Sequence, residues 1–240
     1  PEGKGFTGRA LLALVGGFCS GGALRLLTMA GILKGASGVE DIALAKWSEE
    51  EVMRPREGRQ VVAQYTDDAV LVYQAYPTAI GEYAIANGHF EGAPGFLPDR
   101  MTWIKPNFLW MMYRSGWGMK RNQEVTLGIW LKRPFFEEIL ATAALTTSYG
   151  VCSEEQRKAQ MQTSAVRLQW DPDRMPDGSR LERRAVQLGM KNDVSRCYAS
   201  SDKGVSPIVG IVDLRQFVEE QRICTEVVPC ETVMPQGGIL

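Results

Sequence analysis

Residues 59–76, RQVVAQYTDDAVLVYQAY, say more about the fold than any other stretch of this chain. Two runs rich in Val and Tyr flank the polar segment 66–68, and turn-forming residues between two such runs predict a β-hairpin. The second run, 70–76, is apolar on both of its faces except at Gln74. Because side chains alternate between the two faces of a strand, we expect this strand to be central in a sheet and buried on both sides.

The rest of the chain alternates between helical and strand patterns. Helices are expected over residues 78–87, 106–114, 134–145 and 153–164. Strands are expected over residues 123–132, 165–173 and 183–190, with a strand and helix over 207–221 and a final strand over 223–233. This order predicts an α+β fold with a mixed, mostly antiparallel sheet and interspersed helices. The single GxGxxG match, at residues 3–8, follows no expected strand, and GxxxxGK(S/T) does not occur, so the sequence indicates neither the dinucleotide-binding fold nor the phosphate loop.

We expect the chain of 240 residues to hold one globular α+β domain at 55–240, preceded by an N-terminal extension at 1–54. The extension has basic residues ahead of an apolar run rich in Gly and Ala. This pattern leaves three interpretations open: a targeting or leader remnant, a loosely packed extension, or a membrane-associated helix. The uncharged run 10–24 is shorter than the roughly 20 apolar residues of a membrane-spanning helix, so we do not expect stable membrane insertion.

The composition argues against several classes of function. The formal net charge is -1, which gives no global electrostatic reason to bind nucleic acid or an acidic membrane. The five cysteines form no CxxC pair, and we expect them to be reduced thiols of an intracellular, cytoplasmic protein. Targeting to an organelle by the N-terminal segment is the alternative location. His89 is the single histidine, so we expect no metal site and no Ser-His-Asp catalysis.

The stretch 100–121, RMTWIKPNFLWMMYRSGWGMKR, combines three tryptophans with basic residues at both ends. Pro106 suits the first turn of a helix and Gly116 suits a left-handed C-cap, so a helix is expected over 106–114. The body of this helix, NFLWMMY, is apolar all round, which is typical of a buried core helix. One interpretation of the stretch is therefore purely structural.

The other interpretation concerns the ends of this helix. A helix N-terminus with free amides is a natural anion site, and nearby basic residues would add positive charge. Arg114 is also spaced to lie over the ring of Trp110, four residues earlier. Basic groups, aromatic faces and a helix start together suit a nucleotide, which has a phosphate and a planar ring. The expected ligand-binding residues are Arg100, Trp103, Lys105, Arg114 and Trp117.

Three polar residues lie in or beside otherwise apolar strands. Gln74 and Gln187 are lone amides that must be hydrogen-bonded if they are buried. If their strands are adjacent, the two amides would face one cleft. Asp171, in the segment QWDP, is interpreted first as a turn former, because Asp-Pro is turn chemistry, and second as a general base.

Four motifs carry a family resemblance: YQAY (73–76), RMTWIKPNFLWMMYRSGWG (100–118), VRLQWDPDR (166–174) and AVQLGM (185–190). On these motifs the chain resembles the family catalogued as domain of unknown function 4291. The resemblance covers roughly residues 58–190, leaves 1–54 outside and is weakest after residue 193. It implies membership of a family without implying an activity.

The strand–helix–strand order also looks like that of the ADP-ribosyltransferases, which have a split sheet and use NAD. Those enzymes place an Arg or His on the first strand, then a Tyr or Ser, and usually a Glu on a late strand. The resemblance implies that Gln74 or Arg59 takes the first position, Tyr113 the second and Gln187 the last, with Asp171 a further catalytic candidate. An amide cannot act as a base. Either the acid therefore comes from elsewhere, or the activity is absent or different.

Two functions remain as hypotheses. The first is an enzyme resembling the ADP-ribosyltransferases, a transferase that uses a nucleotide or NAD. The second is a non-catalytic module that holds a nucleotide, an RNA end or another single-stranded nucleic acid by aromatic stacking and positive charge. A carboxylate in the cleft near Arg114 would favour the enzyme. A cleft of amides, arginines and aromatic rings alone would favour the binding module.

Overall fold

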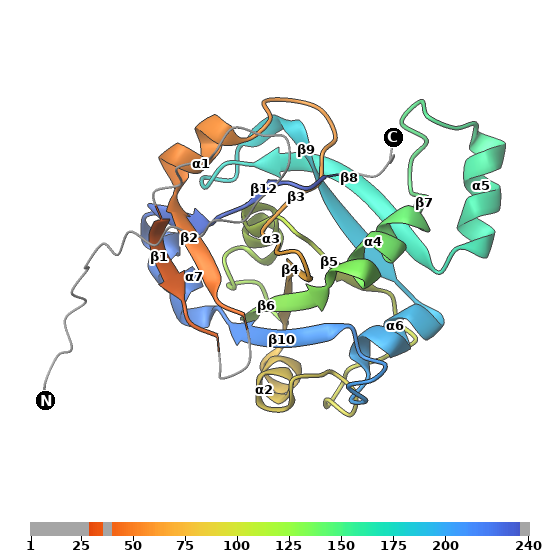
Figure 1. Ribbon diagram of the computed structural model, residues 1–240, viewed down its shortest axis with the longest axis horizontal. Helices are drawn as coiled ribbons and strands as arrows, with labels where there is room; N and C mark the ends of the chain where they lie inside the picture. The colour runs from red at the N-terminus through yellow and green to blue at the C-terminus, as the bar shows by residue number, and fades with distance from the viewer. Residues whose placement is uncertain (1–28, 36–39, 236–240) are drawn as a thin grey trace, which may run out of the picture.

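The computed structural model describes residues 29–35 and 40–235 of the chain (Figure 1). The helices of this part are α1 (Trp47–Met53), α2 (Thr78–Asn87), α3 (Phe108–Ser115), α4 (Arg133–Ala141), α5 (Glu154–Thr163), α6 (Asn192–Ala199) and α7 (Arg215–Ile223). Its strands are β1 (Met29–Leu33), β2 (Ile42–Lys46), β3 (Val62–Ala63), β4 (Ala69–Tyr76), β5 (Thr102–Ile104), β6 (Val125–Lys132), β7 (Ala144–Leu145), β8 (Val166–Arg174), β9 (Arg180–Met190), β10 (Ile208–Asp213), β11 (Val227–Pro229) and β12 (Thr232–Val233). The α+β fold with mostly antiparallel pairing, predicted from the sequence, is confirmed.

The hairpin predicted within 59–76 is confirmed, and its second strand, β4, has neighbours on both sides. The backbone N–H of Thr66 donates to the carbonyl of Ala69 at 2.8 Å, which closes the turn. β4 pairs antiparallel with β6 along its whole length, and β6 pairs with β10. On its other side, Tyr73 and Lys105 exchange two backbone hydrogen bonds of 2.7 and 3.2 Å. Because Lys105 directly follows β5, this contact links β4 to the sheet that contains β5.

That second sheet has the strand order β5-β9-β8-β7. β8 and β9 pair antiparallel, while β7 joins β8 in parallel. β8 runs through Asp171 and Pro172 to Arg174, so the prediction that Asp171 lies in a turn is wrong. Pro172 is tolerated for two reasons. β7 pairs only with Arg167 and Leu168, so this end of β8 is an edge among the described strands. The register of β8 and β9 also shifts after Pro172.

β4 and β6 lie between two hydrophobic cores. On one face of β4, Val70 and Val72 belong to a core shared with β8 and β9. On the other face, Leu71 and Tyr73 belong to a core shared with α3 and α7. All four side chains are fully buried. The prediction that this strand is buried on both faces is therefore confirmed. Helix α3 packs on one face of β4, and α4 and β8 contribute to the core on the other face.

Helix α3 is the helix predicted at 106–114. It begins at Phe108 and ends with Gly116 in the left-handed conformation, at φ 58°. Phe108 and Met112 are fully buried in the core that α3 shares with β4. The structural interpretation of the tryptophan-rich stretch is thus confirmed for this face of the helix.

The segment 29–54, where the structure describes it, packs against the residues expected to form the globular domain at 55–240. β2 pairs with β1, which lies beside it in Figure 1. β2 also pairs with β11, a strand from far along the chain. Ile42 is fully buried. Arg54 forms buried ion pairs with Glu231 at 3.0 Å and Glu50 at 3.6 Å. The described part of this segment is therefore packed into the core and paired in a sheet.

Residues 1–28, which contain the apolar run interpreted as a leader, an extension or a membrane-associated helix, lie outside the described residues. Among the helices that the structure describes, none has both the length and the apolar character that crossing a membrane requires.

Candidate functional site

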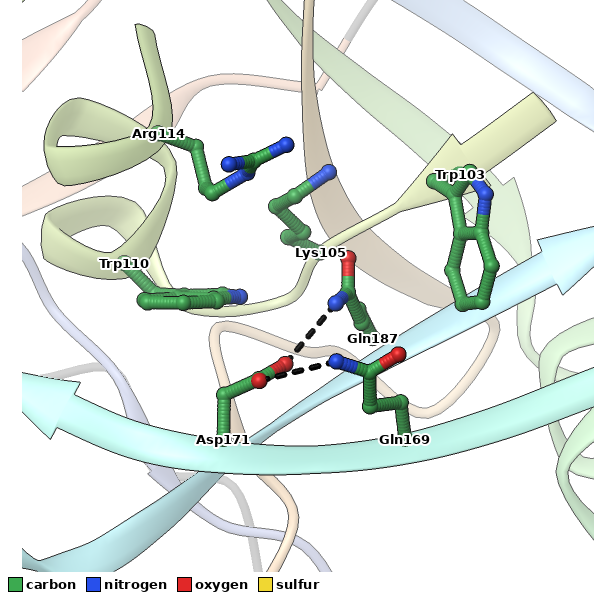
Figure 2. A pocket seen from close by; sticks show the side chains of 7 residues that line it. All are labelled: Trp103, Lys105, Trp110, Arg114, Gln169, Asp171 and Gln187. Carbon is green, nitrogen blue, oxygen red and sulfur yellow. Dashed lines mark hydrogen bonds between the residues drawn. The ribbon is translucent and has the colours of Figure 1, made fainter. Parts of the chain in front are cut away.

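A pocket of about 340 Å³ lies between α3 and the sheet that contains β5, β9 and β8 (Figure 2). Its lining residues are Trp103, Lys105, Trp110, Arg114, Gln169, Asp171 and Gln187. β5 and the residue after it provide the first two, α3 the next two, β8 the following two and β9 the last. The pocket thus collects side chains from three of the four motifs on which the family resemblance rests.

Strand periodicity turns three polar side chains of the sheet toward the pocket. Gln169 and Asp171 are two residues apart on β8 and share a face, while Trp170 between them packs into the core. Gln187 lies directly opposite Gln169 in the antiparallel register of β8 and β9. The two amides and the carboxylate are therefore neighbours by the geometry of the sheet.

The Asp171 carboxylate holds both amides. Gln169 donates its Nε2–H to Asp171 Oδ1 at 2.9 Å, and Gln187 donates its Nε2–H to Asp171 Oδ2 at 2.8 Å (Figure 2). Asp171 and Arg114 line the same pocket.

Two cations line the pocket without a partner. Neither Lys105 Nζ nor the Arg114 guanidinium makes a hydrogen bond or an ion pair with a residue that the structure describes. Lys105 is 7% exposed, whereas Arg114 is exposed at the rim. Burial lowers the pKa of Lys105 from 10.5 to about 8, repulsion by Arg114 adds to this, and attraction by Asp171 opposes it. A buried cation with a lowered pKa in a pocket is typical of a functional site.

Trp110 is buried, as predicted, but its polar edge belongs to the pocket. Its indole N–H has no acceptor among the described residues, and it points into the pocket in Figure 2. The ring stacks on Tyr113, with 5.5 Å between centroids and 16° between planes. Arg174 lies over Trp110 at 5.8 Å, whereas the cation–π pair expected between Arg114 and Trp110 is not formed.

The start of α3 does not offer the free anion site that the sequence suggested. Glu231 accepts a hydrogen bond from the Phe108 backbone N–H at 2.7 Å, so a carboxylate of the protein itself occupies the positive end of the helix. Burial raises the pKa of Glu231 to about 8, although Arg54 and the Phe108 N–H both act to lower it. An anionic ligand in the pocket would therefore meet side-chain donors and not the helix end.

Gln74 lies outside the pocket and is a satisfied core amide. Its Nε2 donates to Thr102 Oγ1 and to the Trp103 carbonyl, both at 2.9 Å. Its Oε1 accepts from two buried tyrosine hydroxyls at 3.0 and 2.6 Å. β5 lies between β4 and β9, so the strands of Gln74 and Gln187 are not adjacent, which was the condition for the two amides to face one cleft. Gln74 instead helps to position β5, which carries the pocket wall Trp103.

Three further predicted residues also lie outside the pocket. Tyr113 is exposed and has Arg174 over its ring at 3.6 Å. Trp117 packs edge-on against Phe108, with 6.0 Å between ring centroids. Arg100 is exposed in the loop before β5. The predicted residues that the structure brings together in the pocket are Trp103, Lys105, Arg114, Asp171 and Gln187.

Sequence reasoning missed two lining residues. Gln169 was not singled out, although its spacing of two from Asp171 on a strand places both on one face. Trp110 was assigned to the core, although its spacing of four from Arg114 on a helix places both on one side. Arg59, the alternative to Gln74, lies over the Tyr149 ring at 5.3 Å and does not line the pocket.

The described residues contain no group of three or more His, Cys, Asp or Glu side chains that could hold a metal ion.

Comparison with known proteins places the chain in a family. No curated protein and no solved structure matches it. A family model described as "Domain of unknown function (DUF4291)" matches residues 60–236, a range that includes every residue lining the pocket. The match continues well past residue 193, where the resemblance was expected to weaken. The chain therefore belongs to the DUF4291 family.

Proposed function

We propose that the pocket binds a nucleotide-type ligand, which carries a phosphate and a planar ring. One observation carries this proposal: the Lys105 ammonium, the Arg114 guanidinium and the Trp110 indole N–H line one pocket and have no partner among the residues that the structure describes. Donors of this kind favour an anionic oxygen ligand, and hydrogen bonds to charged groups are the strong ones. The volume of about 340 Å³ falls within the roughly 300–1,000 Å³ of small-molecule sites.

Arg114 and Lys105 suit the phosphate. A guanidinium presents a planar fork of N–H donors that matches phosphate oxygens, while an ammonium acts as a compact point charge. Lys105 is charged at a cost, because burial lowers its pKa to about 8. A bound phosphate would offset that cost, so anion binding should raise the pKa of Lys105 toward its ordinary value.

Trp103 suits the ring, because in Figure 2 its indole lies beside the group formed by Asp171 and the two glutamines. Trp110 turns its N–H edge to the pocket, and its ring stacks on Tyr113. Stacking of a base on an aromatic side chain contributes roughly 1–3 kcal/mol and tolerates every base. This part of the pocket therefore suits a nucleobase in a free nucleotide or at the end of an RNA strand.

The test is isothermal titration of the full chain with ATP, ADP-ribose, NAD and a short RNA with and without a terminal phosphate. Arg114→Ala is expected to weaken binding roughly tenfold or more, because a hydrogen bond to a charged group contributes about 1.5–3 kcal/mol. The matched control is Arg100→Ala, which removes an exposed arginine outside the pocket and should leave the dissociation constant unchanged.

Two outcomes would contradict the proposal. The first is that none of these ligands binds the full chain. The second is that Arg114→Ala and Arg100→Ala weaken binding equally, which would mean that the ligand responds to surface charge in general. If only the RNA with a terminal phosphate binds, the phosphate site is supported and the ligand is an RNA end, not a free nucleotide.

Catalysis is a second candidate function, favoured by the position of Asp171. The carboxylate lines the same pocket as both cations, so it can take the place of the acid that the transferase hypothesis lacked at Gln187. If the pocket holds NAD, Asp171 would stabilise positive charge that develops on the ribose as nicotinamide leaves. The assay is nicotinamide release from NAD. Release that Asp171→Asn abolishes would support an enzyme that breaks the nicotinamide–ribose bond of NAD, with water or an acceptor nucleophile forming the new bond to the ribose. NAD binding without release would leave the binding module.

A further inference from the structure

The Asp171 carboxylate determines which way both pocket amides face. A carboxylate only accepts hydrogen bonds, so the group of each glutamine that faces Asp171 must be its NH₂. The short contacts of 2.9 and 2.8 Å from Gln169 and Gln187 therefore fix both amides in one orientation. Their carbonyl oxygens are turned away from Asp171 (Figure 2).

These two oxygens are free acceptors beside the pocket walls. No residue that the structure describes donates a hydrogen bond to Oε1 of Gln169 or Gln187, and neither oxygen is among the buried atoms without a partner. In Figure 2 the Gln169 oxygen faces Trp103 and the Gln187 oxygen faces the Lys105 side of the pocket. Because the two residues are directly opposite across β8 and β9, the oxygens can serve one ring edge.

We propose that Gln169 and Gln187 are specificity residues that select a guanine-type base, whose ring edge carries two neighbouring N–H donors. This inference rests on the proposed nucleotide-binding function. Guanine offers N1–H and the 2-amino group to the two oxygens. Adenine offers an acceptor at N1 beside its one amino donor at N6, so at most one amide oxygen would be paired and the other would face the lone pair of N1. Asp171 is then a positioning residue, since it acts by orienting the two amides.

The polarity of the pocket agrees with this assignment. The unpaired donors, Lys105, Arg114 and the Trp110 N–H, suit the phosphate and oxygen atoms of a ligand. The fixed amide oxygens are the acceptors that remain for its N–H groups. Without Asp171, each glutamine could rotate its amide and accept or donate, and the pocket would lose the ability to distinguish the two purines.

The experiment is titration of the full chain with GMP, IMP and AMP, with ribose 5-phosphate as the ligand that lacks a base. GMP is expected to bind roughly tenfold or more tightly than AMP, since a good bidentate contact discriminates by about 1–3 kcal/mol. IMP keeps N1–H and lacks the 2-amino group, so its dissociation constant should fall between the two.

Asp171→Asn tests the positioning role. It replaces the carboxylate by an amide that can also donate, so one glutamine can turn, and the ratio of AMP to GMP dissociation constants should fall toward one. Ribose 5-phosphate should still bind, which a variant that had merely lost its structure would not show. Gln169→Met removes one acceptor at a half-buried position and should weaken GMP more than AMP. Gln162→Met, on the exposed face of α5, is the matched control.

The outcomes separate this inference from the proposed function. Equal affinities for GMP and AMP, or tighter binding of AMP, would overturn the base selection and leave nucleotide binding in place. A preference for GMP that Asp171→Asn and Gln169→Met leave intact would show that other residues select the base, and this too overturns the inference. If no nucleotide and no ribose 5-phosphate binds, the proposed function fails, and the inference fails with it.

Discussion

Replacement of Lys105 by Met should stabilise the fold and remove anion binding. The ammonium is buried on the pocket wall and has no ion-pair partner among the described residues. Methionine is similar in length and apolar, so Lys105→Met keeps the packing of the side chain and removes the charge. The gain in stability and the loss of binding have the same cause, which is a cation kept in the pocket for a ligand.

The magnitude follows from the pKa of Lys105. A fall from 10.5 to about 8 means that the charged form costs about 3 kcal/mol in the folded protein, at 1.36 kcal/mol for each pKa unit. This cost is fully present below pH 8, where lysine is charged in both states. Between about pH 8 and 10.5 the folded protein loses the proton before the unfolded chain does, so stability rises with pH.

The assay is urea denaturation of wild type and Lys105→Met at several pH values. At pH 7 the variant should be more stable by up to about 3 kcal/mol, or roughly 6–12 °C in melting temperature for a chain of this size. The advantage should shrink toward zero as the pH approaches 10.5. Lys158→Met, at an exposed position on α5, should change stability by less than about 0.5 kcal/mol.

Two results would refute this reasoning. If Lys105→Met is no more stable than wild type at pH 7, the charge of Lys105 is not a cost to the fold. If the variant is more stable but its advantage does not change with pH, the gain comes from apolar packing and not from removal of the charge.

Three further predictions follow from the same structure. Gln74→Met should cost roughly 2–5 kcal/mol in urea denaturation, because it removes four hydrogen bonds and leaves the buried Tyr198 hydroxyl without a partner among the described residues; a smaller loss would mean that water replaces the amide. Gly189→Ala should weaken ligand binding severalfold and shift tryptophan fluorescence, because the new Cβ would lie 2.9 Å from the Trp103 ring; unchanged fluorescence would contradict this. Wild type should lose stability as the pH rises from about 5 to 8, because burial raises the pKa of Glu231 to about 8 and the unfolded chain releases that proton first; Glu231→Gln should lack this loss in a pH series of denaturation curves.

Local signals explain what could be predicted of the fold. The hairpin that leads into β4 is specified by a polar turn between apolar runs, and α3 by Pro106 and Gly116 at its two ends. The role of the segment 29–54 could not be predicted, because β2 pairs with β11, which lies far along the chain. The residues next to β2 in the sequence carry no signal that indicates this pairing. Asp171 was assigned to a turn because the edge position that tolerates Pro172 within a strand depends on where β7 ends.

The candidate site was predictable where residue type alone indicated chemistry. Lys105 and Arg114 stood out as cations beside tryptophans, and both line the pocket. Gln74 and Gln187 had the same sequence signal, a lone amide in an apolar strand, yet only Gln187 lines the pocket. Which amide meets a core hydroxyl and which meets Asp171 depends on the order of strands in the sheet, and a single strand's sequence does not contain that order.

The bond between Glu231 and the start of α3 joins residues 123 positions apart. During synthesis, all seven residues that line the pocket have been added once residue 187 is in the chain. At that stage Glu231, which accepts the hydrogen bond from the first backbone N–H of α3, has not been added. The strand β11, which pairs with β2, has not been added either. A nascent chain that stopped after β9 would therefore contain every side chain of the site without having built it.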